Sequence, residues 1–178
     1  ANGNKIHIVY NGGTYTSNTV NASAANRITA IVSQPKNGTA KELFTLAYDT
    51  NHLLSSIITH NDLAADNHSK KLQFSYTSDS TGKYQLTQIS RCAYVKADEN
   101  TVGTWGTAQT EARYQYYDSS SDSNYRIKRI YDAESRYGLE YSYIKSDTGF
   151  RVYSWHEYAA SSVNGTQTTG AKVRTWNT

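Results

Sequence analysis

The segment Tyr48-Asp49-Thr50-Asn51-His52-Leu53-Leu54-Ser55-Ser56-Ile57 predicts a hairpin turn and the start of the strand that follows it. Ahead of it, Phe44, Leu46 and Tyr48 place a bulky side chain at every second position, which is the period of one face of a β-strand. The Asp49 side chain can accept hydrogen bonds from backbone N–H groups two residues further on and so start a turn. The Tyr48 ring can cover the apolar face while its hydroxyl stays within reach of a polar partner.

The same arrangement recurs five times along the chain. Each copy begins with an alternating strand, at 6–10, 44–48, 72–76, 114–116 and 139–143. Each continues into a second segment that starts at an aliphatic anchor, and the anchors are Ile28, Leu54, Leu86, Ile127 and Val152. The steps between successive anchors are 26, 32, 41 and 25 residues, as expected where insertions enlarge loops without disturbing the strands of stacked repeats.

The 48–57 segment resembles the signature of the YD-repeat (RHS-repeat) family, in which Tyr-Asp and a short turn precede a basic residue and Leu-x-x-Val. Its echoes are Tyr10-Asn11, Tyr117-Asp118 and Ile130-Tyr131-Asp132. The resemblance covers about residues 5 to 158, and a sixth repeat would begin near 171. It implies structural roles in the repeat for Tyr10, Tyr48, Asp49, Tyr76, Tyr116, Asp118 and Tyr143. The chain departs from the family where Thr77 follows Tyr76, where Ile144 follows Tyr143, and where most turns lack glycine.

The composition predicts an all-β fold. The chain has 16 Tyr, 11 Gly and 1 Pro, and its 37% hydrophobic content with a mean hydropathy of -0.71 favours antiparallel strands that are apolar on one face only. We expect residues 1–178 to form one segment, an antiparallel meander of ten to fourteen strands in one strongly twisted or curled sheet. A closed β-barrel is the alternative. The stripe expected to pack on one side is Ile8, Leu46, Phe74, Tyr116 and Tyr141.

Neither the charge distribution nor the spacing of the residues that could act in catalysis or bind a metal predicts an enzyme. The 18 basic residues are scattered through a chain of net charge +3, so nucleic-acid binding is not predicted. No cofactor is predicted either. His52, His60 and His68 are separated by a loop, and the acidic loop 118–124 lacks the Gly and Glu of an EF-hand, so no metal site is expected. Residues 80–83 are predicted to be a turn rather than a phosphate loop. No carboxylate pair is selected by its spacing, and no transmembrane segment is found.

The family resemblance implies a non-catalytic structural role. Because the chain contains no Met, it is expected to be a fragment of a larger protein. Members of the family are typically large bacterial proteins that are secreted or bound to the cell wall. In them, repeats form a strip or shell wall whose partners are other repeats of the parent chain. This function predicts buried rings for the repeat tyrosines and no cleft lined by two carboxylates.

The alternative function is a carbohydrate-binding module that holds a cell-surface glycan on exposed aromatic rings. Flat rings beside polar donors can bind sugars by stacking and hydrogen bonding. The residues predicted for this role are Trp105, Tyr153, Trp155 and Tyr158. Trp155 also occupies an aliphatic position of the repeat, so a packing role is open for it as well. A binding module requires Trp105 or Trp155 to be exposed in a groove.

Overall fold

A computed structural model describes residues 3–11, 14–15, 20–21, 27–60, 69–96, 103–118, 121, 125–134, 136–146, 149–163 and 166–177. The described part of the chain contains β-strands and their connections but no helix. It therefore offers no helix that is long and apolar enough to cross a membrane.

Fourteen strands are present within these ranges. They are β1 (Lys5–Tyr10), β2 (Thr14–Tyr15), β3 (Val20–Asn21), β4 (Ile28–Gln34), β5 (Lys41–Tyr48), β6 (Leu54–Thr59), β7 (Lys70–Ser78), β8 (Tyr84–Val95), β9 (Thr104–Trp105), β10 (Gln109–Tyr116), β11 (Ile127–Tyr131), β12 (Tyr137–Ser146), β13 (Gly149–Val163) and β14 (Thr166–Asn177).

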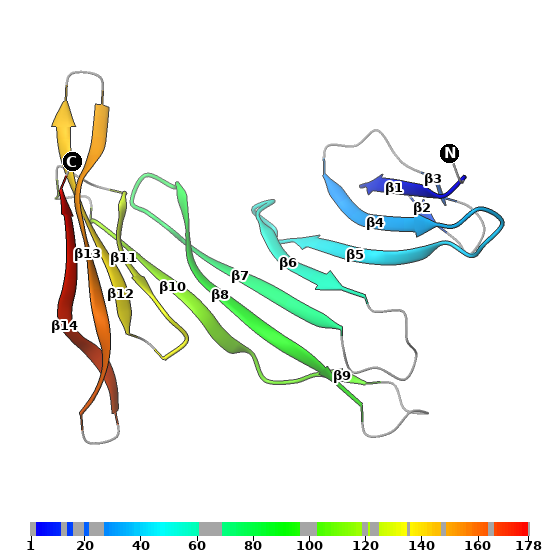
Figure 1. Cartoon of the computed structure of the whole chain (residues 1–178). Coiled ribbons are helices and arrows are strands. Elements are labelled where there is room, and N and C mark those ends of the chain that lie inside the picture. Colours follow the sequence, from blue (N-terminus) through cyan, green and yellow to red (C-terminus); the bar gives the residue numbers. More distant parts are fainter. Residues whose placement is uncertain are drawn as a thin grey trace. The chain divides into compact units, whose positions relative to one another are not determined.

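Twelve of the strands described form one open antiparallel sheet, and β2 and β3 form a separate pair. The strand order is β1-β4-β5-β6-β7-β8-β10-β11-β12-β13-β14, with β9 paired to β8. The strands of this sheet are therefore arranged in the order in which they occur along the chain. Figure 1 shows this sequence of hairpins for β11 to β14. The predicted all-β antiparallel meander is confirmed. The order ends at β1 and β14, so the sheet is open rather than closed as in the barrel alternative.

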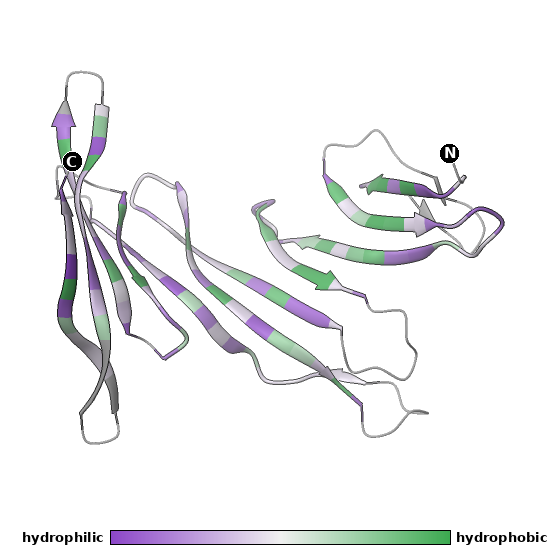
Figure 2. Ribbon diagram, viewed as in Figure 1, coloured by the Kyte–Doolittle hydropathy of each residue, from purple (hydrophilic) through white to green (hydrophobic). Residues whose placement is uncertain are grey.

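The contacts divide the chain into two compact units. Unit 1 comprises Ala1–Gln73 and Arg91–Ala108, and unit 2 comprises Phe74–Ser90 and Gln109–Thr178. The strands β7 and β8 therefore contribute residues to both units. Hydrophobic and hydrophilic positions succeed one another along these two strands in Figure 2, as expected for strands with two different faces.

Unit 1 has a small core on one face of its strands. Val9 and Ala30 are paired across β1 and β4 and are 2% and 5% exposed, and Val32 is fully buried. Ile8 pairs with Ile31 on the opposite face and is 44% exposed. For Ile8 the expectation of a packed apolar stripe is therefore wrong. Alternating side chains predict that a strand has two faces. Because β4 carries apolar residues on both faces, its sequence does not indicate which face is buried.

Three of the five repeat tyrosines tie their repeat to the preceding one. The rings of Tyr10, Tyr48, Tyr76, Tyr116 and Tyr143 are half-buried rather than buried as predicted. Three of their hydroxyls donate to the backbone carbonyl of the preceding repeat's aliphatic anchor: Tyr48 to Ile28 at 3.0 Å, Tyr116 to Leu86 at 2.8 Å and Tyr143 to Ile127 at 2.9 Å. The predicted polar partner of the tyrosine hydroxyl is confirmed at these three positions.

One aspartate turn occurs three times, at Asp49, Asp79 and Asp132. In each, Oδ1 accepts the N–H groups two residues on (2.9, 2.7 and 3.0 Å) and four residues on (2.9, 3.0 and 3.0 Å). The aspartate N–H also donates to the carbonyl four residues on, at 2.9, 2.8 and 2.8 Å. The predicted turn at 80–83 is confirmed. Asp118 differs, because its longer loop closes through Tyr117 N–H donating to the Arg126 carbonyl at 2.9 Å.

Candidate functional site

Of the four aromatic residues predicted to bind a ligand, Trp105 lies in unit 1 and the other three lie in unit 2. Trp105 belongs to unit 1, where its half-buried ring meets Tyr94 edge-on at a centroid distance of 5.2 Å. Trp155 belongs to unit 2 and stacks on Trp176 at 5.3 Å with 16° between the ring planes. Trp155 is half-buried and Trp176 is 46% exposed.

Tyr158 lies on the face opposite to Trp155. Trp155 is the cross-strand partner of Tyr141, whereas the Tyr158 hydroxyl donates to Glu140 Oε2 at 2.8 Å. Because Glu140 and Tyr141 are consecutive in β12, their side chains lie on opposite faces. Tyr153 is 49% exposed and lies where the β12–β13 register is irregular. A ligand role for each of the four residues stays a prediction, and within unit 2 Trp155 and Tyr158 lie on opposite faces of the strand.

Glu140 lies at the centre of a cross-strand polar cluster on that face. Its Oε1 accepts from Arg129 Nε and Nη2, both at 2.8 Å. Partial burial opposes ionisation of Glu140, but the bonds from Tyr158 and Arg129 and the arginine charge outweigh it and lower the pKa of this carboxyl. Burial, followed by the bond to Glu140 and its charge, raises the pKa of Tyr158 to about 12. The Arg129 guanidinium also lies 4.4 Å from the Tyr137 ring centroid, so this cluster is internally satisfied.

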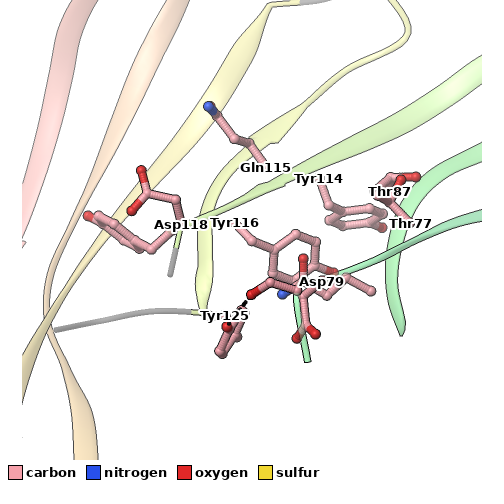
Figure 3. A pocket seen from close by; sticks show the side chains of 11 residues that line it. Thr77, Asp79, Thr87, Tyr114, Gln115, Tyr116, Asp118 and Tyr125 are labelled. Atoms are coloured by element: carbon pink, nitrogen blue, oxygen red, sulfur yellow. Dashed lines mark hydrogen bonds between the residues drawn. The ribbon is translucent and has the colours of Figure 1, made fainter. Parts of the chain in front are cut away.

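An open groove with a volume of about 380 Å³ lies in unit 2. It is bordered by the β7–β8 hairpin, the end of β10 and the loop after it, and Figure 3 shows side chains from all three segments around it. Its lining has four tyrosines, two carboxylates, two amides and three hydroxyl residues, namely Tyr114, Tyr116, Tyr117, Tyr125, Asp79, Asp118, Gln85, Gln115, Thr77, Ser80 and Thr87. The expectation that no cleft would be lined by two carboxylates is therefore wrong.

Two polar atoms in the groove lining are buried without a partner. Among the residues described, Asp79 Oδ2, Gln85 Nε2 and Arg113 Nε are the buried side-chain atoms that lack a hydrogen bond, and the first two border this groove. Asp79 Oδ1 is occupied by the turn, since it accepts from the N–H and hydroxyl of Thr81 and from the N–H of Lys83. A buried acceptor or donor without a partner costs free energy and calls for an explanation.

Most of the tyrosine hydroxyls in the groove lining are held by the protein. The Tyr116 hydroxyl donates to the Leu86 carbonyl and the Tyr117 hydroxyl to the Tyr141 carbonyl, both at 2.8 Å. The Tyr125 hydroxyl lies 3.5 Å from Ser80 Oγ. These bonds fix the orientation of the rings in the groove wall.

A second pocket of about 440 Å³ lies near Arg113 and Tyr131. The Gln115 side chain points away from Tyr114 and Tyr116 in Figure 3, as alternation along β10 requires. Gln115 Oε1 accepts from the Tyr131 hydroxyl at 2.9 Å, and Arg113 lies 5.7 Å from the Tyr131 ring centroid. This second pocket therefore has the side chains of Arg113 and Gln115, and Gln115 lines the groove as well.

The histidines do not form a metal centre in the part of the chain that the structure describes. His60 lies 2.7 Å from Thr45 Oγ1 and 3.5 Å from Glu42, while His52 occupies the Asp49 turn and His68 lies outside the described residues. No group of three His, Cys, Asp or Glu residues in the described ranges could hold a metal ion. Cys92 is buried, with its sulfur 3.1 Å from Gln73 Oε1.

No protein-family model and no curated protein matches this chain. Among solved structures, it is similar to a porin-like protein from Bacteroides uniformis. The two chains share 15% sequence identity, and the match covers 87% of this chain and 86% of that one. The TM-score is 0.24, which is too low to support an argument about fold or function.

Proposed function

We propose that the chain is a non-catalytic structural segment of an exported YD-repeat protein, acting as a surface strip or shell wall. The observation that carries this proposal is the hydrogen bond from a repeat tyrosine to the anchor carbonyl of the preceding repeat, which occurs at Tyr48, Tyr116 and Tyr143. A bond that recurs in phase with the repeat supports an architectural purpose for the Tyr position, because chemistry at a single site would not need it several times.

The strand order supports the same proposal. Each repeat lies between its sequence neighbours in an open sheet, so stability depends mainly on the contacts between successive repeats. Such an arrangement can be lengthened by adding repeats without redesigning a central core. The partners expected for this function are therefore other repeats of the parent chain, and the expected location is the cell surface or the extracellular medium.

Surface labelling of intact cells tests the proposed function. Antibodies raised against the purified chain are applied to cells that express the parent gene, before and after permeabilisation, and externally added protease is then used to probe the labelled segment. We expect labelling of intact cells and a protease-resistant fragment of about this chain's length. Labelling that requires permeabilisation, or digestion as fast as that of the urea-unfolded chain, would contradict an exported structural strip.

The alternative function, a carbohydrate-binding module, is favoured by a different observation. The groove of unit 2 combines tyrosine rings with hydroxyl, amide and carboxylate side chains. A structural strip can carry such a site on one of its repeats, so the two functions are compatible within one chain.

A further inference from the structure

We propose that the second pocket of unit 2, around Arg113 and Gln115, binds the carboxylate of an acidic saccharide. The inference goes beyond the structural function and does not depend on it. The pocket is open to solvent, and its volume of about 440 Å³ falls within the range of roughly 300–1,000 Å³ that is typical of small-molecule sites. All of its described lining residues belong to unit 2.

Arg113 has a positive charge without an anionic partner. In the same unit, Arg129 pairs with Glu140 at 2.8 Å. The Arg113 guanidinium forms no hydrogen bond or ion pair with the residues that the structure describes, and it lies 5.7 Å from the Tyr131 ring centroid. Because Arg113 is half-buried, its charge has lost part of its hydration without gaining a carboxylate in exchange. An acidic ligand would supply the missing partner.

The Arg113 atoms that a ligand would contact are accessible. Of the three guanidinium nitrogens, Nε is buried, and the proposed contact does not use it. Nη1 and Nη2 also lack a hydrogen-bond partner among the described residues, but they are not buried, so a ligand in the pocket that Arg113 lines can reach them. The two Nη atoms of a guanidinium can donate to the two oxygens of one carboxylate.

Gln115 places a further donor at the same site. Arg113 and Gln115 are two residues apart in β10, so their side chains lie on one face of the strand. The Tyr131 hydroxyl donates to Gln115 Oε1 at 2.9 Å, which fixes the amide and leaves Nε2 without a partner in the described part of the chain. Gln115 is an exposed residue, so its Nε2 can donate to a carboxylate that is bound at Arg113.

Polar groups and rings of the pocket suit the remainder of a sugar. Gln88 Nε2 donates to Ser90 Oγ at 2.7 Å, which leaves Gln88 Oε1 as an acceptor for a sugar hydroxyl. Ser75 is exposed and adds a hydroxyl group. The rings of Tyr114 and Tyr131 are half-buried, and their faces can pack against the C–H groups of a sugar ring. These groups favour a saccharide over a small inorganic anion.

The charge of the pocket favours an acidic saccharide over a neutral one. Among the described residues, no Asp or Glu lines this pocket, whereas Arg113 contributes a positive charge. The groove of unit 2 has the opposite character, since Asp79 and Asp118 border it and no described Lys, Arg or His does. Hydrogen bonds between a guanidinium and a carboxylate are about twice as strong as those between neutral groups. A uronic acid unit, which joins a carboxylate to a ring with hydroxyl groups, has the chemistry that this pocket requires.

Affinity gel electrophoresis of the chain tests the proposal. The probes are polygalacturonate and alginate, and each is compared with its esterified form, in which most of the carboxylates are neutral. We expect at least one of the two acidic polysaccharides to retard the wild-type chain, with an affinity at least about tenfold higher than that of its esterified form. Chemical-shift changes produced by the corresponding uronate trisaccharide should localise to Arg113, Gln115 and Tyr131.

The substitutions Arg113→Gln and Gln115→Glu test the two donors. Arg113→Gln removes the guanidinium, whereas Gln115→Glu keeps an acceptor for the Tyr131 hydroxyl and replaces the Nε2 donor with a carboxylate oxygen. Each should lower the affinity for the acidic polysaccharide by at least about tenfold. Arg27→Gln is the matched control, because Arg27 is also half-buried, lies 5.6 Å from the Tyr48 ring centroid and does not line the pocket. All three variants change the net charge by the same amount, and the affinity of Arg27→Gln should stay within about twofold of wild type.

Three results would overturn the proposal. The first is a folded wild-type chain that neither acidic polysaccharide retards more than its esterified form does. The second is retardation that Gln115→Glu leaves unchanged, and this variant decides alone if circular dichroism shows Arg113→Gln to be unfolded. The third is an equal loss of affinity in Arg27→Gln and Arg113→Gln, which would mean a general attraction between a positively charged chain and a polyanion. None of these results bears on the surface-labelling test, so failure of the saccharide site and failure of the structural function can be told apart.

Discussion

At the scale of single residues, the repeat tyrosines give the clearest test of the architecture. Replacing Tyr48, Tyr116 or Tyr143 with Phe keeps the ring and removes only the hydroxyl that donates to Ile28, Leu86 or Ile127. A typical intramolecular hydrogen bond contributes about 0.5–1.5 kcal/mol net, and the carbonyl loses its partner. We expect each variant to lower the free energy of unfolding by about 1 kcal/mol in urea titrations.

The control for these variants is Tyr84→Phe. Tyr84 is 44% exposed and does not occupy the Tyr position of a repeat. Removing the Tyr84 hydroxyl should change the free energy of unfolding by less than about 0.5 kcal/mol, as is usual for surface substitutions. If the three repeat-tyrosine variants were as stable as Tyr84→Phe, the tyrosine-to-anchor bond would not be the link between repeats.

The polar cluster around Glu140 predicts that the free energy of unfolding falls both at acidic and at alkaline pH. The pKa of Glu140 is lowered from its ordinary 4.5, so its stabilising contribution is present above that pH and is lost as pH falls through the lowered value. The pKa of Tyr158 is raised to about 12, so its contribution is present below pH 10.0 and is lost as pH rises through about 12.

The substitution Glu140→Gln tests both effects. It removes the charge that raises the pKa of Tyr158, so an NMR titration should find this pKa moved from about 12 toward 10.0. It should also flatten the acid side of the plot of unfolding free energy against pH. Glu157→Gln is the control, because Glu157 pairs with the exposed Arg174 at 3.5 Å. A pKa of Tyr158 that stays near 12 in Glu140→Gln would contradict the role given to Glu140.

At the scale of elements, the Asp49 and Asp79 turns each contain one residue with positive φ, His52 and Gly82. Gly82 has φ +78° and no heavy atom within 4 Å of the position that a Cβ would occupy, so Gly82→Ala adds backbone strain without a steric clash. We expect it to lower the free energy of unfolding by about 1–2 kcal/mol. Gly138→Ala is the matched control, because its Cβ also meets open space but its φ is not positive, and it should not destabilise. Equal urea midpoints for the two variants would contradict this account.

The same turns show how far the sequence predicts the elements. The sequence predicts the hairpin at 48–57 from its Tyr-Asp start. In it His52 has φ +67°, and Gly82 has φ +78° at the same place in the Asp79 turn. The aspartate role of Asp79 was missed because Ser78 stands where the motif has Tyr. Its signal was present, however, since Asp79 comes shortly before the turn residues Gly82 and Lys83.

Strand lengths were predicted less well than strand positions. The strands β13 and β14 have 15 and 12 residues, whereas only 151–155 and the end at Trp176 were expected. Their extensions consist mostly of Ala, Ser, Thr and Gly, which give no apolar alternation to mark a face. The groove could not be predicted either, because its lining comes from three segments that are separated along the chain.

At the scale of the whole molecule, an open sheet leaves two edge strands with unpaired backbone groups. The strand order ends at β1 and β14, and all residues of β14 from Ala171 to Asn177 are exposed. Val173 and Trp176 are 59% and 46% exposed within this strand. A long edge strand with exposed apolar side chains is a template for pairing with another chain, although Lys172 and Arg174 oppose such pairing by their charge.

Because β14 combines a free backbone edge with exposed Val173, we expect the chain to self-associate reversibly as its concentration rises. Val173→Lys adds a third charge beside Lys172 and Arg174, so it should weaken this association, and sedimentation velocity over a concentration series should show a smaller rise in the sedimentation coefficient. Val95→Lys is the matched control: Val95 is 51% exposed, but its strand β8 has neighbours on both sides. If Val95→Lys weakened association as much as Val173→Lys, exposed apolar surface in general would drive it and the β14 edge would have no special part.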